Sequence, residues 1–154
     1  MEKGAVISKC QNYRYALWRT WDSSKPIITF VGLNPSTADH ECDDPTIKRC
    51  INFAKSWGAG GIYMVNLFAY RATRPEDMIQ QDDPIGAEND HYLQVVLEKS
   101  EKIIACWGNW GIHQSRSDRV KNLLLEKLYY FELNKTGEPK HPLYVHAETK
   151  IKKF

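Results

Sequence analysis

Short apolar runs rich in β-branched residues alternate along this chain with segments of helical periodicity. The runs at residues 27–33, 61–67 and 102–107 each have the length and composition of a strand that is covered on both faces. Between them, residues 45–57 place apolar side chains at helical spacing, and residues 85–99 predict a further helix. Strands that alternate with helices predict a parallel sheet with helices on both of its faces.

The remaining segments fit the same scheme. Residues 13–21 alternate aromatic or aliphatic side chains with arginines, which is the period-2 pattern of a half-buried strand. Residues 68–83 predict a loop, residues 116–128 a helix and residues 129–133 another strand. The fold class expected for residues 1–154 is therefore a single α/β domain, a three-layer α/β/α sandwich with a central, mainly parallel sheet.

One helix boundary is marked clearly. Asp44 suits the N-cap position and Pro45 the first helical position, because proline lacks the N–H that would be unpaired there. Gly58 predicts the end of this helix.

The amino-acid composition is that of a globular domain. The 154 residues are 42% hydrophobic and 26% charged, which is ordinary for a globular domain and excludes disorder as the main state. No apolar run approaches a membrane span or a signal peptide, so we expect a cytoplasmic protein that contacts no membrane. Cys10, Cys42, Cys50 and Cys106 are widely spaced, which predicts buried, reduced thiols and no metal site. A net charge of +2 is compatible with a nucleic-acid partner without predicting one.

Polar loops follow the predicted buried strands. In open parallel sheets, ligands bind outside the carboxyl ends of the strands. Loops of this kind begin at residues 32, 66 and 107, and a fourth lies at residues 141–144. With this topology, Asn34, Asn66, Trp107 and His141 converge on one cleft.

Six ordered blocks of sequence resemble the bacterial and phage DUF1643 family, a domain of unknown function. The resemblance runs from Tyr13 to Tyr144, and its blocks are GLNPSTAD, DDPTIKRC, VNLFAYRATRP, DPIG, WG and KTGEPKHPLY. That family is in turn similar to the uracil-DNA glycosylase superfamily, nearest its mismatch-specific branch. There a G-I-N-P loop follows the first central strand, and an H-P loop closes the site.

This second resemblance implies roles for individual residues. Asn34 matches the asparagine that positions the attacking water, and His141 matches the histidine that donates a hydrogen bond to the departing base. The residues expected to bind substrate are Pro35, Ser36, Thr37, Asp39, Phe53, Asn66, Arg71, Thr73, Trp107, Leu143 and Tyr144. Among them, Asn66 would line the base pocket, Phe53 would stack on a flipped base, and Leu143 with Tyr144 would wedge into the duplex.

The implied activity is hydrolysis of the N-glycosidic bond of a damaged or modified base in DNA, without a cofactor. Ser36 and Thr37 depart from the glycine that follows N-P in the mismatch-specific relatives, so activity on uracil does not follow from the resemblance. The cysteines do not reproduce the iron–sulfur spacing of some relatives. Two alternatives stay open: a hydrolase of a free nucleoside or nucleotide, and a non-catalytic domain that binds a nucleobase or nucleic acid.

Each of these residues also has a structural interpretation. Asn34 and its neighbours suit a strand-ending turn, and Asn66 suits a bond to neighbouring backbone. The acidic run at residues 39–44 is either a divalent-metal site or, as adjacent ligands rarely converge on one ion, a solvated loop. Arg71 either holds a phosphate or pairs with a loop carboxylate, and Trp107 either stacks on a base or packs in the core.

Overall fold

Seven strands form one sheet in the computed structural model, which describes residues 1–154. In chain order the strands are β1 (Glu2–Ile7), β2 (Arg14–Thr20), β3 (Ile27–Gly32), β4 (Gly61–Asn66), β5 (Lys102–Ala105), β6 (Leu128–Tyr130) and β7 (Lys152–Lys153). The α-helices are α1 (Pro45–Ser56), α2 (Pro75–Ile79), α3 (Asn89–Lys99) and α4 (Arg116–Leu124). Three 3₁₀ helices are η1 (Asn109–Ser115), η2 (Leu125–Lys127) and η3 (Pro142–Tyr144).

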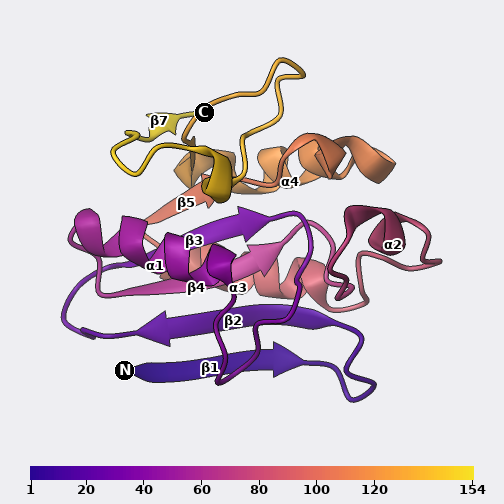
Figure 1. Ribbon diagram of the computed structural model, residues 1–154, viewed down its shortest axis with the longest axis horizontal. Coiled ribbons are helices and arrows are strands. Elements are labelled where there is room, and N and C mark those ends of the chain that lie inside the picture. The colour runs from indigo at the N-terminus through magenta and orange to yellow at the C-terminus, as the bar shows by residue number, and fades with distance from the viewer.

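The sheet is mixed, with the strand order β1-β2-β4-β3-β5-β6-β7 (Figure 1). The centre of the sheet is parallel. Strand β3 pairs in parallel with β4 and with β5, and β5 pairs in parallel with β6. The pairings β1–β2, β2–β4 and β6–β7 are antiparallel. The α/β class is therefore confirmed, while a mainly parallel sheet describes only the centre. Strand β2 runs opposite to the central strands because the short turn at residues 21–26 reverses the chain before β3, whereas two parallel strands need a longer crossover between them.

Helix α1 begins and ends where the sequence predicts. The Asp44 side chain accepts a hydrogen bond from the Ile47 N–H, and Pro45 occupies the first turn. The helix ends at Ser56, and Gly58 adopts a φ of 77°, the left-handed conformation that glycine tolerates best.

Helices cover both faces of the sheet. On one face, Ile28 and Phe30 of β3 pack with α1 in a core cluster of 16 buried residues. On the other face, Val31 belongs to a cluster of 15 buried residues that includes Leu93 of α3 and Val120 of α4. Because successive side chains of a strand point to opposite faces, the two clusters are separated by the sheet. Figure 1 shows α1 in front of β3 and β4.

Strand β2 is buried rather than half-buried. Its two arginines, Arg14 and Arg19, are 2% and 0% exposed, contrary to the pattern expected of residues 13–21. Arg19 forms an ion pair with Asp43 at 2.7 Å, and its Nη2 donates to the Asp39 carbonyl at 2.6 Å. Arg14 donates to the Ala38 carbonyl at 3.0 Å. The loop at residues 38–43 therefore folds over β2 and covers its arginines.

Three short elements depart from the sequence analysis. Strand β1 extends the sheet at one edge, β7 adds two residues at the other, and α2 forms within residues expected to be a loop. Cys50 and Cys106 are buried as predicted, whereas Cys10 and Cys42 are exposed, and all four thiols are free. None of the helices combines the length and apolar character needed to cross a membrane.

Candidate functional site

The carboxyl ends of the central strands meet beside a cavity of about 790 Å³. Gly32, the last residue of β3, pairs with Asn66 at the end of β4, and Val31 pairs with Ala105 at the end of β5. The loops that leave these strands therefore emerge at one edge. The predicted site residues that line the cavity are Asn34, Pro35, Ser36, Thr37, Asn66, Thr73, Trp107, His141, Leu143 and Tyr144.

Three predicted residues do not line this cavity. Phe53 is 3% exposed in the core, where its ring packs against those of Trp57 and Phe131 with centroid distances of 5.6 and 4.6 Å. The Asp39 carboxylate accepts hydrogen bonds from the backbone N–H groups of residues 41 and 42, so it stabilises its own turn. Arg71 donates to the Gln11 carbonyl at 3.3 Å.

Asn34 projects from the loop that follows β3. Its Nδ2 donates to the carbonyls of Ala72 at 2.8 Å and Pro35 at 3.2 Å. The Ala72 N–H in turn donates to the Pro35 carbonyl, so the loops after β3 and β4 are joined at this point. The amide oxygen of Asn34 accepts no hydrogen bond within the protein. It is thus free to accept one from a molecule in the cavity.

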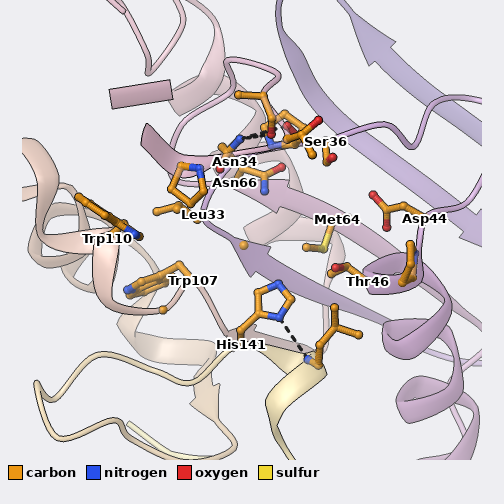
Figure 2. Close-up of a pocket in the computed structure, with 18 of the residues that line it drawn as sticks. Leu33, Asn34, Ser36, Asp44, Thr46, Met64, Asn66, Trp107, Trp110 and His141 are labelled. Atoms are coloured by element: carbon orange, nitrogen blue, oxygen red, sulfur yellow. Dashed lines mark hydrogen bonds between the residues drawn. The ribbon is translucent and has the colours of Figure 1, made fainter. Parts of the chain in front are cut away.

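His141 faces the cavity from the opposite side (Figure 2). Its Nδ1 accepts a hydrogen bond from the Leu143 N–H at 3.2 Å, which requires that Nδ1 carry no proton. In the neutral imidazole the proton then lies on Nε2, which points into the cavity. Burial lowers the pKa of His141, an effect that the negative charge of Asp44 partly opposes. The ring therefore presents a neutral Nε2–H donor.

Asn66 and Arg14 form the floor of the cavity. Arg14 donates from Nη2 to the Asn66 Oδ1 at 3.4 Å, and since arginine only donates, the Asn66 Nδ2 must turn the other way. That nitrogen has no acceptor in the protein, although Asn66 is 2% exposed. Asn89 holds the backbone of this residue by donating to its carbonyl at 2.9 Å. The buried amide of Asn66 thus offers its N–H groups to the cavity.

Arg14 carries a buried charge without a carboxylate partner. Burial lowers its pKa to about 10, so the guanidinium stays protonated at neutral pH. Its Nε makes no hydrogen bond, and the Asp44 charge is the largest favourable influence on it. An anionic group in the cavity would therefore meet a fixed positive charge beneath it.

Trp107 forms one wall and is itself held in place. Its Nε1 donates to the buried Glu138 carboxylate at 2.6 Å, and the Ser117 hydroxyl donates to the other oxygen of that carboxylate at 2.9 Å. Gly111 lies so close that a Cβ there would stand 2.3 Å from the Trp107 ring. Trp107 is 1% exposed and belongs to the core cluster of Leu93 and Val120, so its ring packs in the core and presents no open face for stacking. The exposed side chains of Trp110, Leu143 and Tyr144 surround the mouth.

Several cavity residues were not predicted as site residues from the sequence. Arg14 lies in a strand whose alternation suggested solvent exposure, and Asp44 was interpreted as a helix cap within an acidic run. Met64 and Gly32 complete the floor, and a Cβ at Gly32 would stand 2.9 Å from the Asn66 Nδ2. A glycine at the end of a buried strand, two residues before an Asn-Pro turn, was the one available signal for this close approach. No three histidine, cysteine, aspartate or glutamate side chains come together as a ligand set for a metal ion.

Comparison with known protein families gives one match. The family described as "Protein of unknown function (DUF1643)" matches residues 14–143, a range that includes every cavity-lining residue except Tyr144. Neither the curated proteins nor the solved structures contain a match to this chain. The family description assigns no activity.

Proposed function

We propose that this chain, which belongs to the DUF1643 family, hydrolyses the N-glycosidic bond of a damaged or modified base in DNA. The observation that carries the proposal is a pair of groups on opposite sides of one cavity. The free amide oxygen of Asn34 lies on one side, and the Nε2–H of His141 lies on the other.

The two groups suit the two ends of the bond that breaks. Asn34 accepts a hydrogen bond from a water and orients it toward C1′ of the sugar. As the C1′–N bond lengthens, negative charge develops on the base, and the Nε2–H of His141 donates to a base oxygen. The neutral tautomer suits this role because it donates without requiring an acidic pH. The buried Arg14 charge, acting through Asn66, supports the same developing charge.

We also propose the finer assignment of the fold, a three-layer α/β/α sandwich of the uracil-DNA glycosylase type. Its support is the order of the loops: Asn34-Pro35 follows β3, Asn66 ends β4, and His141 caps η3, which begins at Pro142. This is the order in which the glycosylase superfamily carries its water-positioning, base-binding and histidine loops.

The mouth of the cavity supports a nucleic-acid substrate. Tyr144 and Leu143, 79% and 45% exposed, lie with Trp110, 42% exposed, around the same mouth and form an apolar patch there. Side chains of this kind can enter the base stack of a duplex and fill the space that a flipped base leaves.

One observation favours a second candidate, a domain that binds a nucleobase without hydrolysing it. The Nδ2 of Asn34 is committed to the Ala72 and Pro35 carbonyls, so this residue already has a structural role in joining two loops. In that case the cavity would bind a base, and no water would be activated.

A strand-cleavage assay after alkali treatment separates the two candidates. The substrates are duplex and single-stranded oligonucleotides that carry uracil, hypoxanthine, xanthine, mismatched thymine or hypermodified pyrimidines. We expect cleavage at one base by the wild type and its loss in Asn34→Ala, with Asn122→Ala, an exposed asparagine on α4, as the matched control. Full activity of Asn34→Ala would contradict the water-positioning role. Binding without cleavage across the panel would favour the second candidate.

A further inference from the structure

The Asp44 carboxylate has one oxygen that its helix cap does not use. Oδ1 accepts the Ile47 N–H at 2.9 Å, while Oδ2 accepts no hydrogen bond from the protein. Asp44 lines the cavity, and Figure 2 shows its carboxylate turned toward the space between Asn34 and His141. Its negative charge influences both Arg14 and His141. The cap therefore leaves a charged acceptor free inside the cavity.

Hydrolysis in this cavity needs such an acceptor. A water that attacks C1′ must lose a proton, and the amide oxygen of Asn34 can orient the water but is not a base. The Nδ1 of His141 is occupied by the Leu143 N–H, and its Nε2 already carries a proton. Arg14 has no lone pair to offer. The remaining titratable lining residue, Tyr144, is a largely exposed hydroxyl at the mouth.

We propose that Asp44 is the general base of this hydrolysis, an inference that rests on the proposed function. As the water oxygen forms its bond to C1′, the Asp44 Oδ2 takes one water proton. The electron pair of the C1′–N bond leaves with the base, whose charge the His141 Nε2–H stabilises. The proton on Asp44 then passes to the base nitrogen. The products are the free base and a sugar that carries the hydroxyl at C1′, and Asp44 is restored.

Two substitutions separate this role from the helix cap. Asparagine and serine cap helices about as well as aspartate, so Asp44→Asn and Asp44→Ser should both preserve α1. Asp44→Asn keeps the side-chain shape and removes the base. Asp44→Ser also leaves space, which a small carboxylate such as formate can enter. The matched control is Asp22→Asn, because the Asp22 side chain is 39% exposed and its carboxylate also accepts a hydrogen bond from a backbone N–H, that of Ser24.

We expect Asp44→Asn to lower kcat on the cleaved oligonucleotide by about 100-fold or more, with KM and melting temperature near the wild-type values. Formate should restore activity to Asp44→Ser and not to Asp44→Asn, an effect that a purely structural role would not produce. Asp22→Asn should cleave as the wild type does.

The outcomes distinguish the two proposals. If the wild type cleaves and Asp44→Asn cleaves equally well, Asp44 is not the general base, although the glycosylase activity stands. The same conclusion follows if Asp44→Ser is inactive and formate does not restore its activity. No wild-type cleavage at any base would overturn the proposed hydrolysis, and the role of Asp44 with it.

Discussion

The protonation state of one imidazole, that of His141, links the proposed chemistry to stability. Burial lowers the pKa of His141 below its ordinary value of 6.5, so the unfolded chain binds this proton more readily than the folded one does. The stability that neutral His141 contributes is complete above about pH 6.5, the pKa of the unfolded chain. It is lost as the pH falls toward the lower pKa that His141 has in the folded protein. We expect the unfolding free energy of the wild type to decrease more between about pH 7 and pH 5 than that of His141→Gln.

Urea denaturation at several pH values measures this difference, and His146→Gln is the matched control. His146 also accepts a backbone N–H at Nδ1, from Glu148, but it is exposed. This variant controls for the loss of an imidazole that is not buried. If His141→Gln followed the wild-type curve, burial of the neutral ring would not contribute to stability.

Substitutions of Phe53 and Tyr144 should distinguish a residue that stabilises the core from a residue that binds the substrate. The Phe53 ring packs against Trp57 and Phe131, so Phe53→Ala should lower the unfolding free energy by roughly 3–5 kcal/mol. Tyr144→Ala removes an exposed ring at the cavity mouth and should leave stability nearly unchanged while weakening oligonucleotide binding. Chemical denaturation and a binding titration on both variants provide the test. A stable Phe53→Ala protein with weakened binding would place that ring in the site instead.

At the scale of elements, the loop at residues 38–43 depends on the buried Arg19 of β2. Its Nε pairs with Asp43, and its Nη2 donates to the Asp39 carbonyl. Arg19→Met removes these contacts and leaves the Asp43 carboxylate without its partner, which should lower the unfolding free energy by about 3–5 kcal/mol. Arg74→Met is the control, because Arg74 pairs with Glu76 on the surface and such pairs contribute about 0–1 kcal/mol. Equal stability of the two variants by urea denaturation would show that the loop is held by other contacts.

The elements predicted most accurately from sequence are those whose pattern reflects local burial. The run at residues 27–33 is apolar because β3 is covered on both faces. The ends of α1 are marked by the residues beside it, the N-cap Asp44 and the glycine at position 58. Strands β1 and β7 pair with β2 and β6 at the edges of the sheet, and their short sequences, EKGAVI and KK, carry no such pattern. The burial of β2 was missed because the loop that covers its arginines comes later in the chain.

The candidate site could be predicted only in part for the same reason. Asn34, Asn66 and His141 were found because each sits in a polar loop after a strand or in a family block. Arg14 and Asp44 reach the cavity from the start of a strand and the start of a helix, and their side chains face it only once the sheet has formed. Sequence position alone assigns them the ordinary roles of a strand arginine and a helix cap.

At the scale of the whole molecule, the buried thiols report whether α1 and the sheet open together, because Cys50 on α1 and Cys106 after β5 belong to the same core cluster. Cys10 and Cys42 are exposed, whereas Cys50 and Cys106 are buried, and burial raises the pKa of both buried thiols. A thiol reagent should therefore label two cysteines of the folded protein at once and the other two at the rate of opening of the fold. In Cys10→Ser/Cys42→Ser only the slow reaction should remain. Rapid labelling of Cys50 would mean that α1 opens separately from the sheet.

The same slow reaction measures what the cavity binds, because a ligand of the folded state alone reduces the population of open forms. At a ligand concentration of about 100 Kd, labelling of Cys50 and Cys106 should slow by about 100-fold. We expect this protection from a nucleobase or nucleoside and not from ribose phosphate, which lacks the base. Gly32→Ala should remove the protection, since the added methyl would stand 2.9 Å from the Asn66 Nδ2 and displace the amide that faces the base. Protection by ribose phosphate alone would instead identify the buried Arg14 charge as the feature that selects the ligand, and the cavity would then recognise an anion before it recognises a base.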